Sequence, residues 1–279
     1  MAIKITPLSD HTGAEVRGVD LAGAVDDATR AALNAAFSEH SVLAIRNQTL
    51  TAPQLLEAIQ LFGPVFRQHN TRFALPECPL IHYLSNQDQY DNGKRYIPGA
   101  GYHTDHSNAE EPPKATLLLA IELPDSGGDT QYVNMQRAYE DLPEDTKTRI
   151  ADLQAVHVYQ SKHSERKLTG LSPEAKALVP DSVRHPLVRT HPENGRKSLY
   201  LNPIRIESID GMAEADTLQL LDELLAHATQ EKYQYRHKWQ ARDLVIWDNR
   251  CLLHKANGDY DHSQTRYLYR AMLQGSRPV

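Results

Sequence analysis

The stretch Gly101-Tyr102-His103-Thr104-Asp105-His106-Ser107 gives the first indication of both the fold and the chemistry of this chain. In an extended segment, side chains alternate between two faces, so His103 and Asp105 would point the same way. An imidazole nitrogen and a carboxylate oxygen on one face are two of the three ligands of a two-histidine, one-carboxylate triad. Because such a triad holds non-haem Fe(II) and leaves coordination positions open, the motif predicts an iron site.

The His-x-Asp spacing is weak evidence by itself, because histidine is frequent in this chain. Among 14 histidines in 279 residues, an acidic residue two positions later is expected about once or twice by chance. A rival match, His163-Ser164-Glu165, has the same spacing. A surface histidine beside an acidic residue is the alternative interpretation of either match, so the rest of the sequence has to decide.

The composition is that of an ordinary globular protein, with 40% hydrophobic and 24% charged residues. A chain of 279 residues is long enough to bury a sizeable core. No repeat or Gly/Ser-rich linker divides it, so we expect a single domain over residues 1–279. The net charge of −6 argues against nucleic acid as the main partner, because binding phosphates requires a basic face.

The sequence predicts a cytoplasmic protein without a membrane partner. Residues 1–5 lack the long apolar run of a signal peptide, and the apolar residues 117–121 are too few to span a bilayer. In a chain without an export signal, the two cysteines, Cys78 and Cys251, are expected to be free thiols in the core.

Strand patterns dominate the chain, with helical patterns between them. Asp26 is expected to cap a helix that runs to about His40, and Thr51 to cap another that ends at Gly63-Pro64. Further helices are predicted at residues 137–142, 144–152 and 213–229, and strands at residues 3–5, 15–19, 41–46, 80–84, 115–123, 131–133, 155–159, 183–189, 198–202, 233–239, 244–247 and 266–273. This pattern indicates an α+β, mainly β fold, and a jelly-roll core with flanking helices suits so many short strands.

Residues 86–101 are polar and rich in Gly, Asn and Asp, and they lead directly into His103 and Asp105. Loops of this length in a compact domain are usually functional, so the segment could form a lid over the site. A surface excursion without a role in the site is the alternative. The sequence supports both interpretations equally.

Two stretches near the C-terminus are also informative. Residues 243–254 lead from an apolar strand through a turn to His254, and Arg266 and Arg270 share one face of an alternating strand. If that face lines a barrel, the two guanidinium groups need anions, and their planar forks suit carboxylate or sulfonate oxygens. If it faces solvent, Tyr267 and Tyr269 pack inward instead, and periodicity alone does not choose.

Several short motifs, taken together and in order, resemble those of one enzyme family. They are Gly13-Ala14-Glu15, Phe62-Gly63, His103-Thr104-Asp105 followed by Pro112-Pro113, Leu123-Pro124 with Gly127-Gly128-Asp129-Thr130, His185-Pro186-Leu187-Val188-Arg189-Thr190-His191-Pro192, and Trp247-Asp248-Asn249-Arg250 with His254. Over nearly its full length the chain resembles the taurine/chlorophenoxyacetate (TauD/TfdA) family of Fe(II)- and 2-oxoglutarate-dependent dioxygenases. The resemblance implies a double-stranded β-helix core, and it leaves the rival His163-Ser164-Glu165 outside the matching motifs.

The resemblance also implies roles for particular residues. The implied Fe(2+) ligands are His103, Asp105 and His254. Thr130 and Arg266 would bind the distal carboxylate of 2-oxoglutarate, and Arg270 would bind the acidic group of the primary substrate. Such enzymes use O2 to hydroxylate a small carboxylate or sulfonate, releasing succinate and CO2. Hydroxylation beside a heteroatom can then lead to cleavage of a C–O, C–N or C–S bond.

The residues that would select the substrate differ from those of taurine-type members. A gapless alignment from Phe62-Gly63 puts Gln68 where those members have a histidine, with His69 adjacent, and Tyr102 stands where they have a tryptophan. We therefore expect an organic acid other than taurine. The candidate substrate-binding residues beside Arg270 are His69, Tyr102, Asn86 and His106, with a surface position equally compatible for His106.

Two other classes of protein are compatible with parts of this pattern. A non-catalytic jelly-roll protein that binds a small acid would not need the complete set of metal ligands found here. A zinc-dependent hydrolase could use the same ligands, but it has no use for a 2-oxoglutarate-binding pair at Thr130 and Arg266. The sequence does not choose between a monomer and a homo-oligomer.

Overall fold

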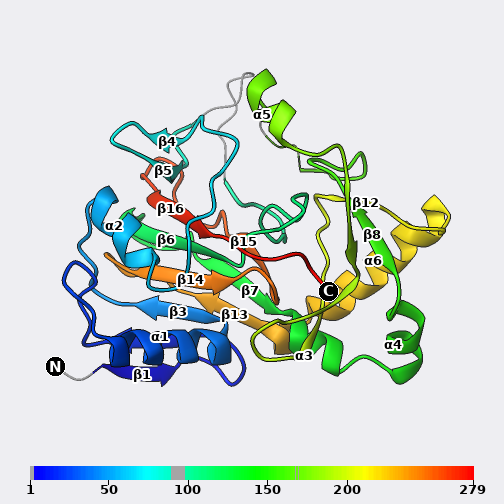
Figure 1. Cartoon of the computed structure of the whole chain (residues 1–279), viewed down its shortest axis with the longest axis horizontal. Coiled ribbons are helices and arrows are strands. Elements are labelled where there is room, and N and C mark those ends of the chain that lie inside the picture. The colour runs from blue at the N-terminus through cyan, green and yellow to red at the C-terminus, as the bar shows by residue number, and fades with distance from the viewer. Residues whose placement is uncertain (1–2, 89–97, 167, 169) are drawn as a thin grey trace.

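The computed structural model describes residues 3–88, 98–166, 168 and 170–279, and these are mostly sheet with helices around them (Figure 1). The largest sheet has eight strands, and neighbouring strands are antiparallel except for the parallel pair β2 and β3. In spatial order these strands are β1 (Lys4–Pro7), β2 (Ala14–Arg17), β3 (Val42–Ile45), β14 (Leu244–Asp248), β6 (Ala115–Glu122), β16 (Tyr267–Leu273), β5 (Cys78–Ser85) and β4 (Ala74–Leu75).

Smaller antiparallel sheets complete the β structure of the described residues. One contains β13 (Gln234–His237), β7 (Thr130–Asn134) and β15 (Leu252–Ala256) in that order. A second contains β12 (Ile206–Ile209), β8 (Gln154–His157) and β9 (Val183–Pro186), and a third pairs β10 (Val188–Thr190) with β11 (Lys197–Leu199). The expectation of a mainly β fold with some helices is confirmed.

The large sheet is buried on both faces, as the alternation along β6 shows. Leu117 and Leu119 point into a first hydrophobic cluster with helices α1 (Asp27–His40) and α2 (Ala52–Ile59). Leu118 and Ala120 point the other way, into a cluster that includes residues of β7 and β15. The β13-β7-β15 sheet therefore packs face to face against the large sheet, with a hydrophobic layer between them.

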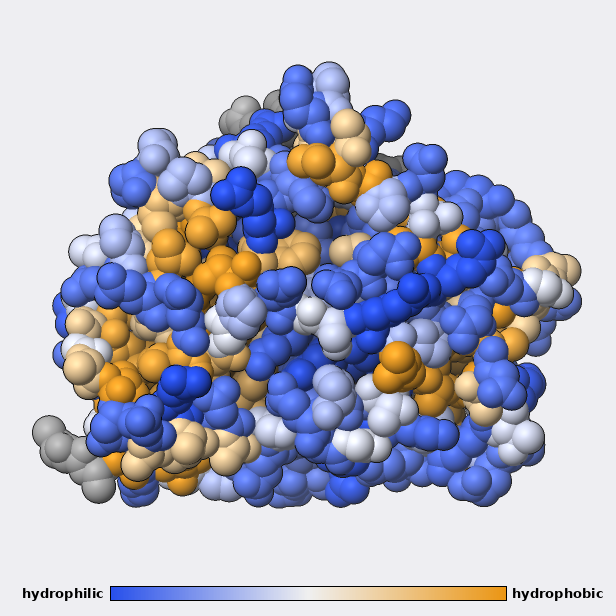
Figure 2. Space-filling view, viewed as in Figure 1, coloured by the Kyte–Doolittle hydropathy of each residue, from blue (hydrophilic) through white to orange (hydrophobic). Residues whose placement is uncertain are grey.

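A further hydrophobic cluster lies around the remaining helices and sheets. It joins residues of β8, β10, β11 and β12 to α3 (Met135–Glu140) and α6 (Glu214–Ala228). The other helical elements are α4 (Glu144–Ile150), α5 (Pro173–Leu178) and a 3-10 turn at Glu231–Tyr233. The face in Figure 2 is mainly hydrophilic, with hydrophobic residues in separate patches, as expected when most apolar side chains are inside.

Local sequence signals placed the first two helices well. The Asp26 side chain accepts a hydrogen bond from the backbone N–H of Thr29, so α1 begins as predicted. Thr51 and Gln54 form a reciprocal capping box at the start of α2, but this helix ends at Ile59, before Gly63. The strand predicted at residues 183–189 is two strands, β9 and β10, while α5, β12 and β15 had no predicted counterpart.

Two further expectations concern the cysteines and membrane spans. Cys78 and Cys251 are buried free thiols, as predicted. Among the described residues, no helix has both the length and the apolar character that crossing a membrane requires.

Candidate active site

His103 and His254 are brought together by their backbones. They form an isolated antiparallel bridge, in which each backbone N–H donates to the carbonyl of the other at 3.0 and 2.8 Å. His254 lies on β15, whose position is fixed by pairing with β7 along its full length. The two imidazole rings consequently lie 4.2 Å apart between centroids, although the residues are distant in sequence.

Asp105 joins the two imidazoles from a turn. Its Oδ1 lies 3.8 Å from Nε2 of His103, and its Oδ2 lies 3.8 Å from Nε2 of His254. The three side chains offer donor atoms within 4.8 Å of one another, which suits convergence on a single ion. The predicted proximity of His103 and Asp105 is therefore found, but the assumption of a continuous strand is wrong. The chain turns at Asp105, and His106 has a left-handed φ of 46°.

The environment keeps both imidazoles neutral and suitable for binding a metal. Burial, followed by the nearby His254 and Arg166, holds the pKa of His103 well below its usual range. Burial likewise lowers the pKa of His254 to about 4. The Nδ1–H of His103 donates to the carbonyl of Gly101 at 2.9 Å, so the lone pair of its Nε2 is directed toward Asp105.

The carboxyl group of Asp105 is held as a carboxylate. Burial on its own would raise its pKa, but the adjacent His254 and Arg270 outweigh that effect and hold the pKa below its usual range. At neutral pH the cluster therefore presents two neutral imidazoles and one carboxylate. This is the protonation state that a divalent metal requires of its ligands.

A buried hydrogen-bond network fixes the carboxylate from behind. The hydroxyl of Thr116 on β6 donates to Asp105 Oδ2 at 2.6 Å, and itself accepts from the Asn249 amide at 2.9 Å. Trp247 Nε1 donates to Asn249 Oδ1 at 3.1 Å, and the Thr104 hydroxyl donates to the Asn249 carbonyl at 2.8 Å. All five residues are buried, so the network restricts how Asp105 can move.

A cavity of about 150 Å³ lies against these donor residues, and both Thr130 and Arg266 line it. Nε of Arg266 donates to the Gly128 carbonyl at 2.9 Å. Gly128 has a φ of +67°, and a Cβ there would lie 3.2 Å from Cδ of Arg266. A glycine at this turn therefore allows the arginine to pass close beneath it.

Arg270 lines the same cavity, as do His69, His82 and His106. Its Nη2 donates to Oε1 of Gln68, while its buried Nε has no hydrogen-bond partner in the part of the chain that is described. Of the two alternatives for the Arg266 and Arg270 face, the cavity-facing one is therefore found. His106 also faces the cavity, and His82 was not predicted because β5 carried no motif.

Two predicted substrate residues do not line the cavity. The Tyr102 hydroxyl donates to Gln234 at 2.9 Å, and its ring packs against the cluster around α3 and α6. Neighbouring side chains in an extended segment point to opposite faces, and the adjacent His103 points toward Asp105 and His254, so the Tyr102 side chain points away from them. Asn86 instead donates to the Gln264 carbonyl at 2.8 Å and accepts from the Arg266 backbone N–H at 2.9 Å, so it positions the backbone of Arg266 directly before β16.

The rival His163-Ser164-Glu165 motif lies outside the cavity. His163 and Glu165 do not line the cavity, and they belong to neither potential metal-binding group among the described residues. Most of the segment proposed as a lid, residues 89–97, lies outside the described residues. Asp88, Pro98 and Gly99, which flank it, all line the cavity.

The sequence matches the model of the family described as "Taurine catabolism dioxygenase TauD, TfdA family" over residues 4–272. This chain belongs to the TauD/TfdA family. As a TauD/TfdA enzyme it is a 2-oxoglutarate-dependent dioxygenase, and therefore an oxidoreductase.

Curated TauD/TfdA relatives match nearly the whole chain. The chain is 33% identical to the alpha-ketoglutarate-dependent 2,4-dichlorophenoxyacetate dioxygenase of Cupriavidus pinatubonensis, over 97% of each chain. It is also 33% identical to the alpha-ketoglutarate-dependent sulfate ester dioxygenase of Pseudomonas putida, over 100% of this chain and 92% of that one.

Solved structures of TauD/TfdA type share the fold. A crystal structure of AAD-2 in complex with Mn(II) and N-oxalylglycine superposes with a TM-score of 0.84 at 31% identity, covering 100% of this chain and 99% of that one. A taurine dioxygenase from Burkholderia xenovorans gives a TM-score of 0.83 at 33% identity, covering 99% and 92%.

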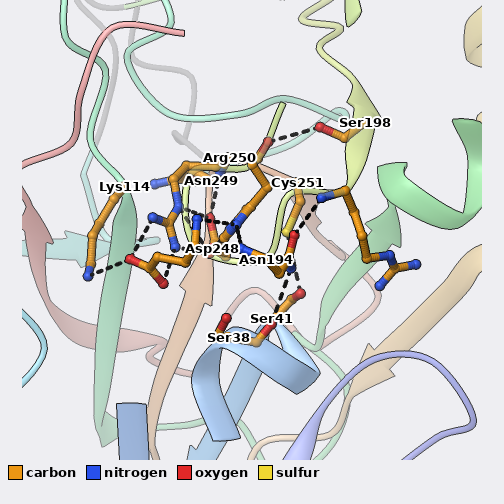
Figure 3. A network of polar contacts seen from close by, with 12 residues as sticks. Ser38, Ser41, Lys114, Asn194, Ser198, Asp248, Asn249, Arg250 and Cys251 are labelled. Carbon is orange, nitrogen blue, oxygen red and sulfur yellow. Dashed lines mark hydrogen bonds and ion pairs between the residues drawn. The ribbon is translucent and has the colours of Figure 1, made fainter. Parts of the chain in front are cut away.

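A second buried polar cluster in this TauD/TfdA chain holds the turn between β14 and β15 (Figure 3). Arg250 donates to both carboxylate oxygens of Asp248, at 2.9 Å to Oδ1 and 2.6 Å to Oδ2. It also donates to both carboxylate oxygens of Glu193, at 2.8 and 3.0 Å, and Lys114 contacts the same carboxylate. These contacts fix the turn that leads directly to His254.

His191, Asp248 and Cys251 within this cluster are close enough to be considered as a second metal site. His191 Nε2 lies 3.0 Å from Asp248 Oδ2, but Arg250 already occupies both oxygens of that carboxylate. Burial raises the pKa of the Cys251 thiol, which therefore stays protonated. We conclude that the cluster is structural.

Proposed function

We propose that this TauD/TfdA-family enzyme binds Fe(II) through His103, Asp105 and His254. The convergence of their donor atoms within 4.8 Å carries the proposal, and the neutral imidazoles and ionised carboxylate fit such a metal. When bound, Fe(II), 2-oxoglutarate and O2 together supply the oxidising chemistry that hydroxylates a C–H bond and releases succinate and CO2.

The protein residues would bind and orient the two organic molecules. Arg266 and Thr130 would hold the distal carboxylate of 2-oxoglutarate, since both line the cavity and the guanidinium is buried there. Arg270 would hold the acidic group of the primary substrate, a small carboxylate, sulfonate or sulfate ester, as with the relatives named above. His69 would line the substrate end of the cavity.

The proposal extends to the architecture and setting of the enzyme. A double-stranded β-helix core is supported by the packing of the β13-β7-β15 sheet against the large sheet, and we propose one domain over residues 1–279. The buried free thiols Cys78 and Cys251 suit a reducing compartment such as the cytoplasm. We propose neither nucleic acid nor a membrane as a partner. The relatives are dioxygenases, so a non-catalytic acid-binding protein and a zinc hydrolase are not favoured.

Succinate formation tests this function directly. The purified protein, supplied with Fe(II), ascorbate, O2 and 2-oxoglutarate, is incubated with 2,4-dichlorophenoxyacetate, with alkyl sulfate esters and without substrate. We expect 2-oxoglutarate-dependent succinate, which Asp105→Ala abolishes and the exposed control Asp181→Ala retains. Succinate formation that survives in Asp105→Ala would contradict the assignment of the site.

A further inference from the structure

The cavity carries more positive charge than the proposed function uses. Its described lining contains four arginines, whereas its acidic residues are Asp88 and Asp105. Arg266 and Arg270 are assigned above to 2-oxoglutarate and to the acidic group of the substrate. The two other arginines, Arg166 and Arg205, have no assigned ligand.

Arg205 is a buried cation without a carboxylate partner among the described residues. It directly precedes β12, and its exposed fraction is 8%. Its Nη1 donates to the Tyr159 carbonyl at 2.6 Å, and the guanidinium lies 5.3 Å from the centroid of the Tyr159 ring. Burial lowers its pKa to about 10, so it remains charged at neutral pH. A buried charge without an ionic partner is costly, and a bound anion would offset that cost.

Arg166 lies close to Arg205 and to the metal ligands. Both arginines line the same cavity as His103, Asp105 and His254, and the charge of Arg166 further lowers the pKa of Arg205. Its Nη1 is buried, with no hydrogen-bond partner in the described part of the chain. Two neighbouring guanidinium groups with unused donor capacity form a typical site for an oxyanion.

Arg270 reaches the cavity from a different part of the fold. It lies on β16 of the large sheet, whereas Arg205 adjoins β12 of the β12-β8-β9 sheet, and Figure 1 shows these strands well apart. His106, Arg205 and Arg270 all line the same cavity. The cations therefore approach the region beside the metal ligands from two walls.

We propose that the primary substrate carries two acidic groups, one bound by Arg270 and the other by Arg205 together with Arg166. This inference rests on the proposed function, because it assigns 2-oxoglutarate to Arg266 and thereby leaves the other three arginines for the substrate. The class it defines is a compact organic dianion, such as a dicarboxylate, and the cavity of about 150 Å³ suits a small molecule.

Matched pairs of dianions and monoanions test the proposal. The probes are straight-chain dicarboxylates of four to eight carbons, each compared with its own monoamide, which has nearly the same shape and one charge fewer. Binding is measured by calorimetry on protein saturated with Fe(II) and 2-oxoglutarate under anaerobic conditions. Visible absorption of the iron complex is followed in parallel, so that a dicarboxylate that merely displaces 2-oxoglutarate is recognised and discounted.

We expect at least one dicarboxylate to bind about tenfold or more tightly than its monoamide, the difference that one charge-assisted hydrogen bond produces. Arg205→Gln and Arg166→Gln should each reduce this preference, with a larger loss of affinity for the dicarboxylate than for its monoamide. Arg205→Lys should restore part of it. The control is Arg184→Gln, which removes an exposed arginine on β9 of the same sheet that pairs with Asp210, and it should keep the full preference.

Equal binding of every dicarboxylate and its monoamide would overturn the proposal, as would a preference that survives in the double variant Arg166→Gln/Arg205→Gln. Thermal unfolding of each variant establishes that it is folded before binding is compared. The proposed function is judged separately, by substrate-independent conversion of 2-oxoglutarate to succinate. If that conversion occurs and the preference is absent, only the dianion inference fails; if it does not occur, the proposed function fails.

Discussion

Arg270 on β16 and His82 on β5 occupy directly opposed positions in the large sheet. Both side chains line the cavity, so a cation and an imidazole share one wall. Burial, and then the charge of Arg270, lowers the pKa of His82 from 6.5 to about 4. The imidazole therefore stays neutral beside the guanidinium at neutral pH, where it can contact a ligand without adding charge.

The first prediction follows from the pKa of His82. Since the unfolded chain binds a proton near pH 6.5 and the folded chain only near pH 4, the free energy of unfolding should fall as the pH drops through this window. The loss attributable to His82 should be on the order of 3 kcal/mol once the pH is below 4. Urea unfolding of the metal-free protein against pH measures it.

His82→Gln should flatten the pH dependence of unfolding, because glutamine does not titrate. The exposed His262→Gln serves as the control and should leave the curve unchanged in shape. An identical pH dependence in His82→Gln and the unmodified protein would show that this imidazole is not held neutral by the fold.

The second prediction concerns the support of the carboxylate ligand by Thr116. Thr116→Val keeps the shape of the side chain but removes the hydrogen bond to Asp105, so the dissociation constant for the metal should rise about 10- to 100-fold. Calorimetric titration with Mn(II), which needs no turnover, measures it. Thr116→Ser retains the hydroxyl, so its affinity for Mn(II) should be close to that of the unmodified protein. If Thr116→Val bound Mn(II) as tightly as the unmodified protein, the proposed support of Asp105 by Thr116 would be refuted.

The third prediction tests whether Arg266 and Arg270, two of the arginines that line the cavity, bind different ligands. Arg266→Gln should raise the KM for 2-oxoglutarate much more than the KM for the primary substrate, and Arg270→Gln should do the reverse. The two variants serve as controls for each other, because both remove one guanidinium from the same cavity. Steady-state kinetics with each component varied in turn measures this, and equal effects on the same ligand would contradict the assignment.

The fourth prediction tests the buried ion pair between Asp248 and Arg250. Arg250→Met leaves the Asp248 carboxylate buried without its main partner, so the free energy of unfolding should fall by about 3–5 kcal/mol. The matched control is Arg149→Met, which breaks an exposed pair with Glu223 and should cost less than about 1 kcal/mol. Urea unfolding compares the two, and similar losses would mean that burial does not govern this pair.

Elements with local signals could be predicted from the sequence. The capping signals at Asp26 and Thr51 depend on only a few adjacent residues, and α1 and α2 begin directly after these two residues. The clustering of His103, Asp105 and His254 could be predicted because an ordered set of motifs accompanies His103-Thr104-Asp105. Arg266 and Arg270 share the cavity because the bulge beside Tyr267 adds its extra residue to β6, so β16 keeps its alternation.

What the sequence missed depends on contacts between distant segments. β15 (Leu252–Ala256) is short and follows a turn, and its strand character comes from pairing with β7. Arg166 and Arg205 reach the cavity from segments without a recognisable motif, and only the folded chain brings them into one cavity with His103, Asp105 and His254. The prediction that Tyr102 binds substrate was wrong because the direction of its side chain is set by a long-range contact, the bridge between His103 and His254.

The most direct test of the account is visible absorption of the purified protein under anaerobic conditions, as Fe(II) and then 2-oxoglutarate are added. We predict a weak metal-to-ligand charge-transfer band that appears only when both are present and that is absent in His254→Ala. If Fe(II) is shown to bind and no such band forms, 2-oxoglutarate does not chelate the metal, and the central claim of an iron- and 2-oxoglutarate-binding site is contradicted.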